Sequence, residues 1–425
     1  MDTRKLKLGD CLSMIRNGAQ IKQKEGAGGI PITRIETLSN GLFNRDRMGY
    51  ANIFDTSEYE DYILQENDIL MSHINSRAFL GRSVQYHKIG SESIIHGMNL
   101  LRIKTNPEIL DCNYAFYFFQ SPYFKKCVDS IRTDAVNQSS INISNICSID
   151  INIPSLAIQQ RIASILGAFD RKIELNRQIN QNLEALARQL YDYWFVQFDF
   201  PDEIGRPYRA NGGKIVYNEE LKREIPQEWD VKEISSLSVI NGHTLSKGGE
   251  LLEIAYLDTS SLTENTISEI QYLSLIDAPS RAQRKVQHKT ILYSTVRPRL
   301  KHYGILCNPS NNMIASTGFA TIDAIDKTMA YYIYSALVQD YITEYLGGVA
   351  DTAVSSYPSI SPTDIGHVKI AIPPSHIIET FDKKISSLFE LKEENESENR
   401  ILIKQRNELL PLLMNGQVNF DLSAD

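Results

Sequence analysis

The amino-acid sequence predicts an α/β (α+β) protein made of two similar globular domains, separated by two long helices that pack as an antiparallel coiled coil. We expect the two halves to form an internal repeat with pseudo-two-fold symmetry. Three observations predict this architecture: a repeated strand motif, a long helical pattern after each copy, and a composition of 42% hydrophobic and 23% charged residues over 425 residues. Such a composition is ordinary for a globular protein, and the length suggests two or three domains.

The repeat is clearest just before each predicted long helix. The segment INISNICSIDINIPS (141–155) recurs as ISPTDIGHVKIAIPP (360–374). At a constant offset of 219 residues five identities coincide: Ile141 with Ile360, Ile146 with Ile365, Ile151 with Ile370, Ile153 with Ile372, and Pro154 with Pro373. Repetition at a fixed offset indicates that one structural unit occurs twice.

Three further pairs of segments extend the repeat upstream. They are 66–77 with 288–299 (an Ile-Leu strand followed by a polar loop), 30–41 with 253–264, and the aromatic helical segments 113–124 with 329–342. The order is therefore domain, helix, domain, helix. The predicted boundaries are 1–152 for the first domain, 153–198 for the first helix, 199–224 for a polar linker, 225–371 for the second domain, and 372–425 for the second helix and its tail.

A period of 3.6 residues predicts both long helices. In the first, apolar residues recur from Ile158 to Trp194 with Asn176 as the one polar exception, over about 55 Å at 1.5 Å per residue. The second pattern runs from Ile377 to Leu413 and includes Asn395. Pro411 is expected to bend or end this helix, and Asn415-Gly416 to stop it.

Each helix carries a longer apolar stripe than one compact domain covers, which favours packing of the two helices on each other. The alternative is that both are ordinary core helices within their own domains. Asn176 and Asn395 either fix the register of the helix pair or face solvent.

The sequence lacks the motifs of several enzyme classes. There is no phosphate-binding P-loop, no H-E-x-x-H zinc motif, no G-x-S-x-G nucleophile elbow, and no clustered Cys/His ligand set. A permissive nuclease pattern (Pro201-Asp202 with Glu220–Lys222) falls in the polar linker, and the eight histidines are spread along the chain. We therefore expect no catalytic residue, no metal site and no cofactor in this chain.

Cysteine usage and hydropathy indicate the compartment. The five cysteines are scattered and none forms C-x-x-C, which favours a reducing cytosol over a disulfide framework. The sequence has no apolar run of about 18 residues and begins without an apolar leader segment. We expect a cytoplasmic protein with no membrane partner.

The charge is unevenly distributed. The chain has a formal net charge of −8, whereas residues 281–303 contain seven Lys or Arg residues and no acid. Phosphates attract such cations, and base edges are read by Arg, Asn, Gln, Ser, Thr or His. The alternative is that these loops are simply solvated.

These residue types gather in the loops that follow the repeated strands and in the basic segment. The candidate DNA-binding residues are Arg34, Ser72, His73, Asn75, Arg77, Arg82, Asn137, Gln138, Arg281, Arg284, Lys285, Thr295, Arg297, Arg299, Lys301 and His302. Charge reversal at Arg297 and Arg299 is the sharpest test of the segment.

With the repeat and the basic loops in view, the chain resembles the specificity subunit of type I restriction–modification systems. The clearest carriers are AIQQRIASILGAFDRKIELNRQINQNLEALARQLYDYWF (157–195) and FPDEIGRPYRANGGKIVYNEELKREIPQEW (200–229). ENDILMS (66–72), 142–154, 361–374 and RNELLPLLMNGQV (406–418) add to it, so the resemblance covers essentially the whole chain. One departure is PSHIIETFDKKI (374–385), which lacks the Gln-Gln-Arg-Ile that begins the first helix.

The resemblance implies two target-recognition domains that each read one half of a bipartite, asymmetric site in double-stranded DNA, with the two helices as spacers. It implies that two modification subunits bind the chain to form an adenine-N6 methyltransferase, and that restriction subunits add ATP-dependent translocation and cleavage. S-adenosylmethionine, ATP and Mg²⁺ are then expected only in those partner subunits. A non-catalytic coiled-coil scaffold that links two protein-binding domains is the main alternative, and an enzyme with an unrecognised site is the third.

Overall fold

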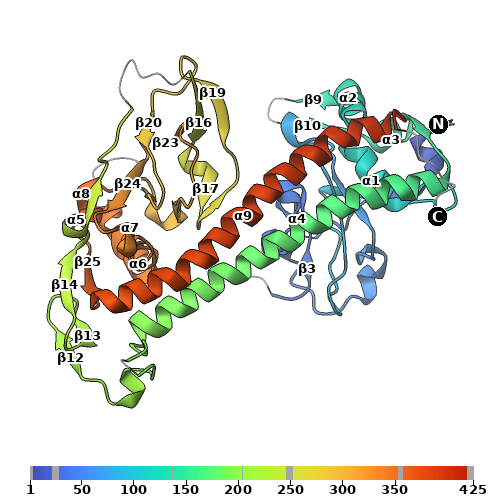
Figure 1. Ribbon diagram of the computed structural model, residues 1–425. Helices are drawn as coiled ribbons and strands as arrows, with labels where there is room; N and C mark the ends of the chain where they lie inside the picture. The colour runs from blue at the N-terminus through green and yellow to red at the C-terminus, as the bar shows by residue number, and fades with distance from the viewer. Residues whose placement is uncertain are drawn as a thin grey trace. The chain divides into compact units, whose positions relative to one another are not determined.

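The computed structural model describes residues 3–21, 28–135, 138–202, 204–245, 252–352 and 358–418, apart from the side chains of residues 39 and 40. The chain divides into two compact units. Unit 1 comprises Met1–Glu174 and Asn399–Asp425, and unit 2 comprises Leu175–Glu398. Each unit therefore contains one globular domain and a section of both long helices (Figure 1).

Unit 1 is built on a four-stranded antiparallel sheet. Its strands lie in the order β2 (Leu12–Asn17), β8 (Leu100–Thr105), β5 (Ile69–Ser72) and β7 (Ser83–Gln85). Smaller pairings surround it: β1 (Arg4–Lys7) with β11 (Asp150–Ile153), β3 (Pro31–Ile32) with β4 (Gly49–Tyr50), and β6 (Ile74–Asn75) with β10 (Ser139–Ser140) and β9 (Thr133–Asp134). All four residues of β5 are buried, because the strand lies in the interior of the sheet.

Three short α-helices belong to the described part of unit 1, and the first of them packs against β7 and β8 of the sheet. They are α1 (Cys112–Gln120), α2 (Pro122–Ile131) and α3 (Ile143–Cys147). Asp111 and Ser121 cap α1 and α2, since each side chain accepts a hydrogen bond from a first-turn amide. The aromatic residues of α1 pack with the sheet and with the buried face of the long helices in one hydrophobic core.

Unit 2 contains two four-stranded sheets. The first has the order β15 (Ser238–Ile240), β24 (Phe319–Ala324), β21 (Ile291–Ser294) and β22 (Tyr303–Ile305). The second has the order β19 (Gln271–Ser274), β16 (Glu253–Leu257), β23 (Met313–Ser316) and β20 (Ala282–Lys285), with β16 and β23 parallel. Three pairs complete the strands: β12 (Ile215–Asn218) with β13 (Arg223–Pro226), β14 (Asp230–Glu233) with β25 (Lys369–Ile372), and β17 (Leu262–Thr263) with β18 (Thr266–Ile267).

The helices of unit 2 are α5 (Ile234–Leu237), α6 (Ala330–Leu337), α7 (Asp340–Asp351) and α8 (Pro362–Gly366). Every residue of α6 is buried, which explains its aromatic and aliphatic composition. Phe200, in the segment 199–224 that the sequence predicts as a linker, packs in the same core as Trp194 and Trp229, which lie on either side of that segment.

The internal repeat is confirmed by sheet order and register. The order β2-β8-β5-β7 in unit 1 matches β15-β24-β21-β22 in unit 2, and Ile69 opposite Ile103 matches Ile291 opposite Ile322. The aromatic segments form corresponding helix pairs, α1–α2 and α6–α7. The domain boundaries drawn from the sequence remain predictions, because the compact units divide both long helices.

Both long helices are present as predicted, and in each unit they run antiparallel. Helix α4 spans Leu156–Tyr191 and continues into a π-helical turn at Asp192–Val196, and α9 spans Ser375–Met414. In unit 1, Asp170 of α4 meets Arg406 of α9 (2.5 Å). In unit 2, Asn180 accepts a hydrogen bond from Asn395 (2.8 Å) and Glu184 pairs with Lys392 (3.2 Å), so partner numbers fall as α4 advances (Figure 1).

The two asparagines lie in this helix contact. Asn176 is buried and donates to Glu398 at 2.7 Å, while Asn395 is half-buried and donates to Asn180. Buried polar pairs of this kind fix the register of two helices, because any slip leaves a polar group unpaired. The structure therefore favours the register role over the solvent-facing alternative.

Of the two outcomes that the sequence allows at Pro411, a bend or an end of the helix, the structure excludes the end. The helix continues to Met414, and Gly416 with φ +67° then stops it. Leu410 and Leu413, on either side of the proline, are buried in the core of unit 1. Their burial offsets the hydrogen bond that a proline removes from a helix interior.

Candidate nucleic-acid interface

The loop after β21 carries several of the predicted DNA contacts, and acids distant in sequence hold part of it. The guanidinium of Arg299 lies 2.8 Å from Asp351 and 3.0 Å from Glu344, both on α7. Hydrogen bonds from these carboxylates raise the pKa of Arg299. Residues 281–303 are therefore less basic in the fold than in the sequence, which corrects the expectation of an uncompensated positive segment.

Other side chains of this loop also have partners. Lys301 lies 3.0 Å from Asp340, the first residue of α7, and this hydrogen bond raises the pKa of the lysine. His302 Nδ1 lies 2.8 Å from a backbone carbonyl of β17, and Thr295 donates to the carbonyl of Gly318 (3.0 Å). Arg297 is exposed at a left-handed backbone position (φ +49°), and its amide donates to the carbonyl of residue 358.

Strand β20 supplies the second group of cations in unit 2. Arg281 and Lys285 are exposed, whereas Arg284 between them is half-buried and burial lowers its pKa. Lys289, a further base of this segment, is buried in an ion pair with Asp382 of α9 (2.8 Å). The exposed cations of this second group therefore lie at the two ends of β20.

In unit 1, the loop after β5 begins inside the domain. Ser72 and His73 are buried: the hydroxyl of Ser72 accepts from the Asn75 amide (3.1 Å), and the His73 carbonyl accepts from the Ile141 amide (2.9 Å). Burial lowers the pKa of His73. Both residues hold the loop in place, so their predicted role as DNA contacts is replaced by a structural one.

The remainder of this loop is more accessible. Arg77 is exposed and lies 3.5 Å from Asp129 of α2, and the guanidinium of Arg82 stacks 4.4 Å from the ring centre of Phe79. Gln138 is exposed at the start of β10. Asn137, also predicted as a contact, lies outside the described residues.

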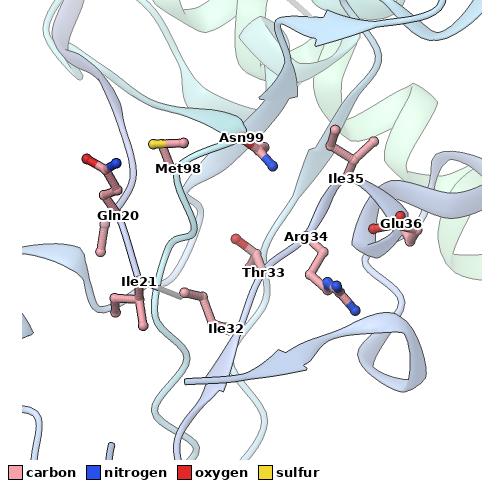
Figure 2. A pocket seen from close by; sticks show the side chains of 10 residues that line it. Gln20, Ile21, Ile32, Thr33, Arg34, Ile35, Glu36, Met98 and Asn99 are labelled. Carbon is pink, nitrogen blue, oxygen red and sulfur yellow. The ribbon is translucent and has the colours of Figure 1, made fainter. Parts of the chain in front are cut away.

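Arg34 lies at a separate hollow in unit 1. The hollow has a volume of 370 Å³ and sits beside the start of β8, at the same end of the sheet as the loop after β5. In Figure 2, Gln20 and Met98 lie on one side of it, Arg34 and Glu36 on the other, and Asn99 at its rim. All five side chains are exposed.

Of these exposed residues, Arg34 is predicted from the sequence as a DNA contact, whereas Gln20, Glu36, Met98 and Asn99 are not. They come from three segments far apart in the chain, and none belongs to a basic or polar run. The one sequence signal that could have found them is the repeated segment 30–41, because the loop that follows its strand is expected to lie near the loop after β5.

The exposed side chains provide the hydrogen-bond donors and acceptors that read base edges and phosphates. Within the described residues, no group of three or more His, Cys, Asp or Glu side chains is placed to hold a metal ion. Across the same part of the chain, no helix is both long enough and apolar enough to cross a membrane. A duplicated sheet on paired helices, with exposed side chains of the types that can read bases at one sheet end, is suited to a protein that confers DNA specificity.

Comparison with known proteins agrees with this class. The family described as "Type I restriction modification DNA specificity domain" matches residues 2–185. The putative type I restriction enzyme MjaX specificity subunit of Methanocaldococcus jannaschii is 28% identical over 435 residues, covering 98% of this chain and 93% of that protein. The MjaIX specificity subunit of the same organism is 24% identical and covers 99% of this chain and 94% of that protein.

A solved structure shows the same fold. The S subunit of a type I restriction–modification system from M. genitalium aligns with a TM-score of 0.55 and 15% identity, over 97% of this chain and 96% of that chain. The chain is therefore similar, over nearly its whole length, to specificity subunits of type I restriction–modification systems, as the sequence predicted. These matches support a role in conferring DNA specificity.

Proposed function

We propose that each half of the chain reads one half of a bipartite, asymmetric site in double-stranded DNA, and that α4 and α9 set the number of base pairs between them. One observation carries the proposal: the same sheet occurs twice, with different exposed side chains at the same end. Because the two halves share one backbone fold, both can dock on DNA in the same geometry. Because their exposed side chains differ, they can read two different base sequences. An uninterrupted α4 of 36 residues corresponds to about 54 Å, enough to span one turn of DNA at about 34–36 Å.

Two methyltransferase subunits dock on the long helices in this proposal. In unit 2, α4 exposes Leu175, Ile179 and Leu186 by 55%, 42% and 50%, and at 3.6 residues per turn these three lie on one face. In unit 1, α9 exposes Ile401 and Leu412 on one face by the same arithmetic. Exposed apolar stripes of this kind mark protein contacts, and each unit carries one.

The chemistry belongs to those partners. We place S-adenosylmethionine and adenine-N6 methylation on the modification subunits, and ATP, Mg²⁺ and DNA cleavage on restriction subunits that join the complex. No cofactor is assigned to this chain. The complex is proposed to work in the cytoplasm, where its DNA lies.

Modified-base sequencing tests the proposal directly. DNA would be sequenced from cells that express the adjacent methyltransferase subunit with and without this chain. We expect a bipartite N6-methyladenine motif with two different halves only when the chain is present. If the complex assembles and the methyltransferase is active but no bipartite motif appears, the chain is a scaffold instead.

The docking surface has its own test. Ile179→Asp and Leu186→Asp together are expected to remove one of two methyltransferase subunits from the complex, because they place charges in an apolar contact. Gln181→Asp, at an exposed position on another face of α4, is the matched control. The mass of the purified complex measures the outcome, and an unchanged mass with the double variant contradicts the assignment.

A further inference from the structure

The geometry points to the hollow around Arg34 as the base-reading centre of the first domain, with Arg34 contacting a guanine of the half-site read by unit 1. The inference rests on the proposed DNA-specificity function and deepens it, since it names one reading residue and the base that it takes. Three observations carry it: the position of Arg34 in the repeat, its poor fit to the local backbone, and the unused hydrogen-bonding groups around it.

The register of the two halves aligns Arg34 with Asp258. Ile32 and Ile95 form a parallel bridge in unit 1, and Tyr256 and Ile314 form the corresponding parallel pair in unit 2. Ile95 and Ile314 are equivalent, because each lies eight residues before the matched isoleucine of β8 or β24, Ile103 or Ile322. The residue two positions after the bridged strand residue is therefore Arg34 in one half and Asp258 in the other, a reversal of charge on the same skeleton.

The local backbone favours aspartate rather than arginine at this position. Both residues directly precede a 3₁₀ helix, η2 (Ile35–Gly41) or η8 (Thr259–Ser261). Asp258 caps its helix, because its carboxylate accepts from the amide of Ser260. Arginine has no acceptor for this role, and in unit 1 Thr37 Oγ1 instead accepts from the Arg34 amide at 2.9 Å. Arg34 thus lies at an exposed hollow without capping the helix that follows it, which indicates a role toward a ligand.

The polar groups of the hollow are available. Across the part of the chain that the structure describes, no side-chain hydrogen bond or ion pair is recorded for Arg34, Gln20, Glu36 or Asn99. Arg299 in unit 2 differs, because two carboxylates already hold its guanidinium. The hollow thus combines unused donors and acceptors with the apolar side chain of Met98.

This combination matches a base pair seen from the major groove. A guanidinium pairs in bidentate fashion with the two acceptors of guanine, O6 and N7, which is the commonest specific protein–DNA contact. Amides such as Asn99 and Gln20 suit neighbouring adenines, and a methionine packs on a thymine methyl group. Phosphate binding alone would not need the amide and apolar neighbours.

In unit 2, the positive charge at the equivalent end of the sheet comes from Arg281, beside β20. Asp258 occupies the equivalent position. Burial opposes ionisation of its carboxyl group, but hydrogen bonds from Ser260 and Tyr256 lower its pKa overall, and the exposed Arg281 near β20 adds to this electrostatically. The amide of Thr317, which corresponds to Met98, donates to the Arg281 carbonyl (2.8 Å). The two halves therefore present different patterns at the same sheet end.

Three variants of the full chain, each assembled with its methyltransferase subunit, test the inference by modified-base sequencing. Arg34→Ala and Arg34→Lys are both expected to reduce discrimination at one guanine of one half-site by about 5- to 150-fold, because lysine keeps the charge but not the two-pronged contact. The other half-site is expected to stay unchanged. Arg4→Ala, an exposed arginine on β1 outside the hollow, is the matched control.

Each other outcome overturns the inference. If Arg34→Lys keeps full discrimination while Arg34→Ala weakens methylation uniformly, Arg34 is a phosphate contact. If both variants keep the motif and its strength, the hollow does not face DNA. These failures differ from failure of the proposed function, in which the unaltered chain itself yields no bipartite motif.

Discussion

The two halves build the same four-stranded sheet around different buried polar groups. In unit 1, Asp68 and Arg102 are 1% and 2% exposed, and the carboxylate lies 2.6 Å from the guanidinium. In unit 2, the hydroxyl of Thr290 donates to Asp323 at 2.6 Å, and the amide of Gln287 donates to the same carboxylate at 3.0 Å. A buried ion pair in one half is replaced by a carboxylate with neutral donors in the other.

The strand register shows which positions of the two halves correspond. Asp68, one residue before Ile69, corresponds to Thr290, and Lys104, one residue after Ile103, corresponds to Asp323. The buried acid therefore lies just before β5 in unit 1, whereas in unit 2 it lies on β24, the neighbour of the equivalent strand β21. Apolar strand residues define this sheet, and the polar groups between the strands are exchangeable as long as each buried carboxylate keeps a donor.

Removing the acid of the ion pair is expected to have the largest effect on stability. Burial raises the pKa of Asp68 and lowers that of Arg102, so desolvation opposes this pair and each partner depends on the other. Asp68→Ala leaves a buried guanidinium without its partner, which costs about 3–5 kcal/mol. Thr290→Val in unit 2 removes a neutral donor to a carboxylate that keeps the Gln287 side chain, together with the acceptor of the Gln287 backbone amide. It costs about 1.5–3 kcal/mol.

Urea denaturation can separate the two units. Trp194 and Trp229 are the two tryptophans of the chain, and both are buried in unit 2, so their fluorescence reports that unit. Far-UV circular dichroism reports both units. Asp68→Ala is expected to lower the urea concentration at which the first phase of the circular dichroism change occurs, and to leave the fluorescence midpoint unchanged. Thr290→Val is expected to lower the fluorescence midpoint. Equal costs for the two variants would break the comparison.

A second contrast concerns pH. His96 is fully buried in unit 1, and its Nε2 contacts the Leu100 carbonyl at 2.8 Å. Burial is the main cause that lowers the pKa of His96 from 6.5 to about 3. Between these values the unfolded chain binds a proton that the folded chain does not, so stability falls as the pH drops below 6.5. The loss by pH 5 is about 2 kcal/mol.

The equivalent position in unit 2 holds Ala315, so this loss is confined to unit 1. His96→Gln keeps a donor for the Leu100 carbonyl and removes the titration. Urea midpoints from circular dichroism, measured between pH 7 and pH 5, are expected to fall less steeply for the variant than for the unaltered chain. Parallel pH dependences would show that His96 does not carry the effect.

The sequence predicted the features that depend on periodicity. The repeat, both long helices and the antiparallel packing follow from apolar spacing, and the structure has them all. The sequence could not predict the ionic partners of Arg299. Glu344 and Asp351 lie far from it along the chain and come close to it only because α7 packs beside the loop. Charge counted over a segment therefore overstated the field of residues 281–303.

Burial was the second limit. Ser72 and His73 look like loop residues in the sequence, yet both are buried, because Ser72 is the last residue of the inner strand β5 and His73 directly follows it. The hollow beside Arg34 was equally out of reach, because its lining comes from three separate segments. Local patterns identified the element that carries each residue but not the side on which the side chain would lie.

The smallest effect is expected for Arg299, and it tests whether equivalent positions share a structural role. Arg77 of unit 1 and Arg299 of unit 2 occupy the same place in the repeated segment, and each meets an acid of the following helix pair: Asp129 in one half, and Glu344 with Asp351 in the other. A side chain that fastens the same loop in both halves contributes little that differs between two half-sites.

Arg299→Ala is therefore expected to leave the methylated motif unchanged, in contrast to variants of Arg34. A direct phosphate contact would reduce the slope of log affinity against log salt by about 0.9 when it is removed. Because the guanidinium of Arg299 is held by two carboxylates, we expect no such reduction when the complex is titrated with its DNA site at several salt concentrations. If the variant lowers this slope by about 0.9, Arg299 contacts a phosphate. The ion pairs with α7 would then exist only in the DNA-free chain and be displaced by DNA.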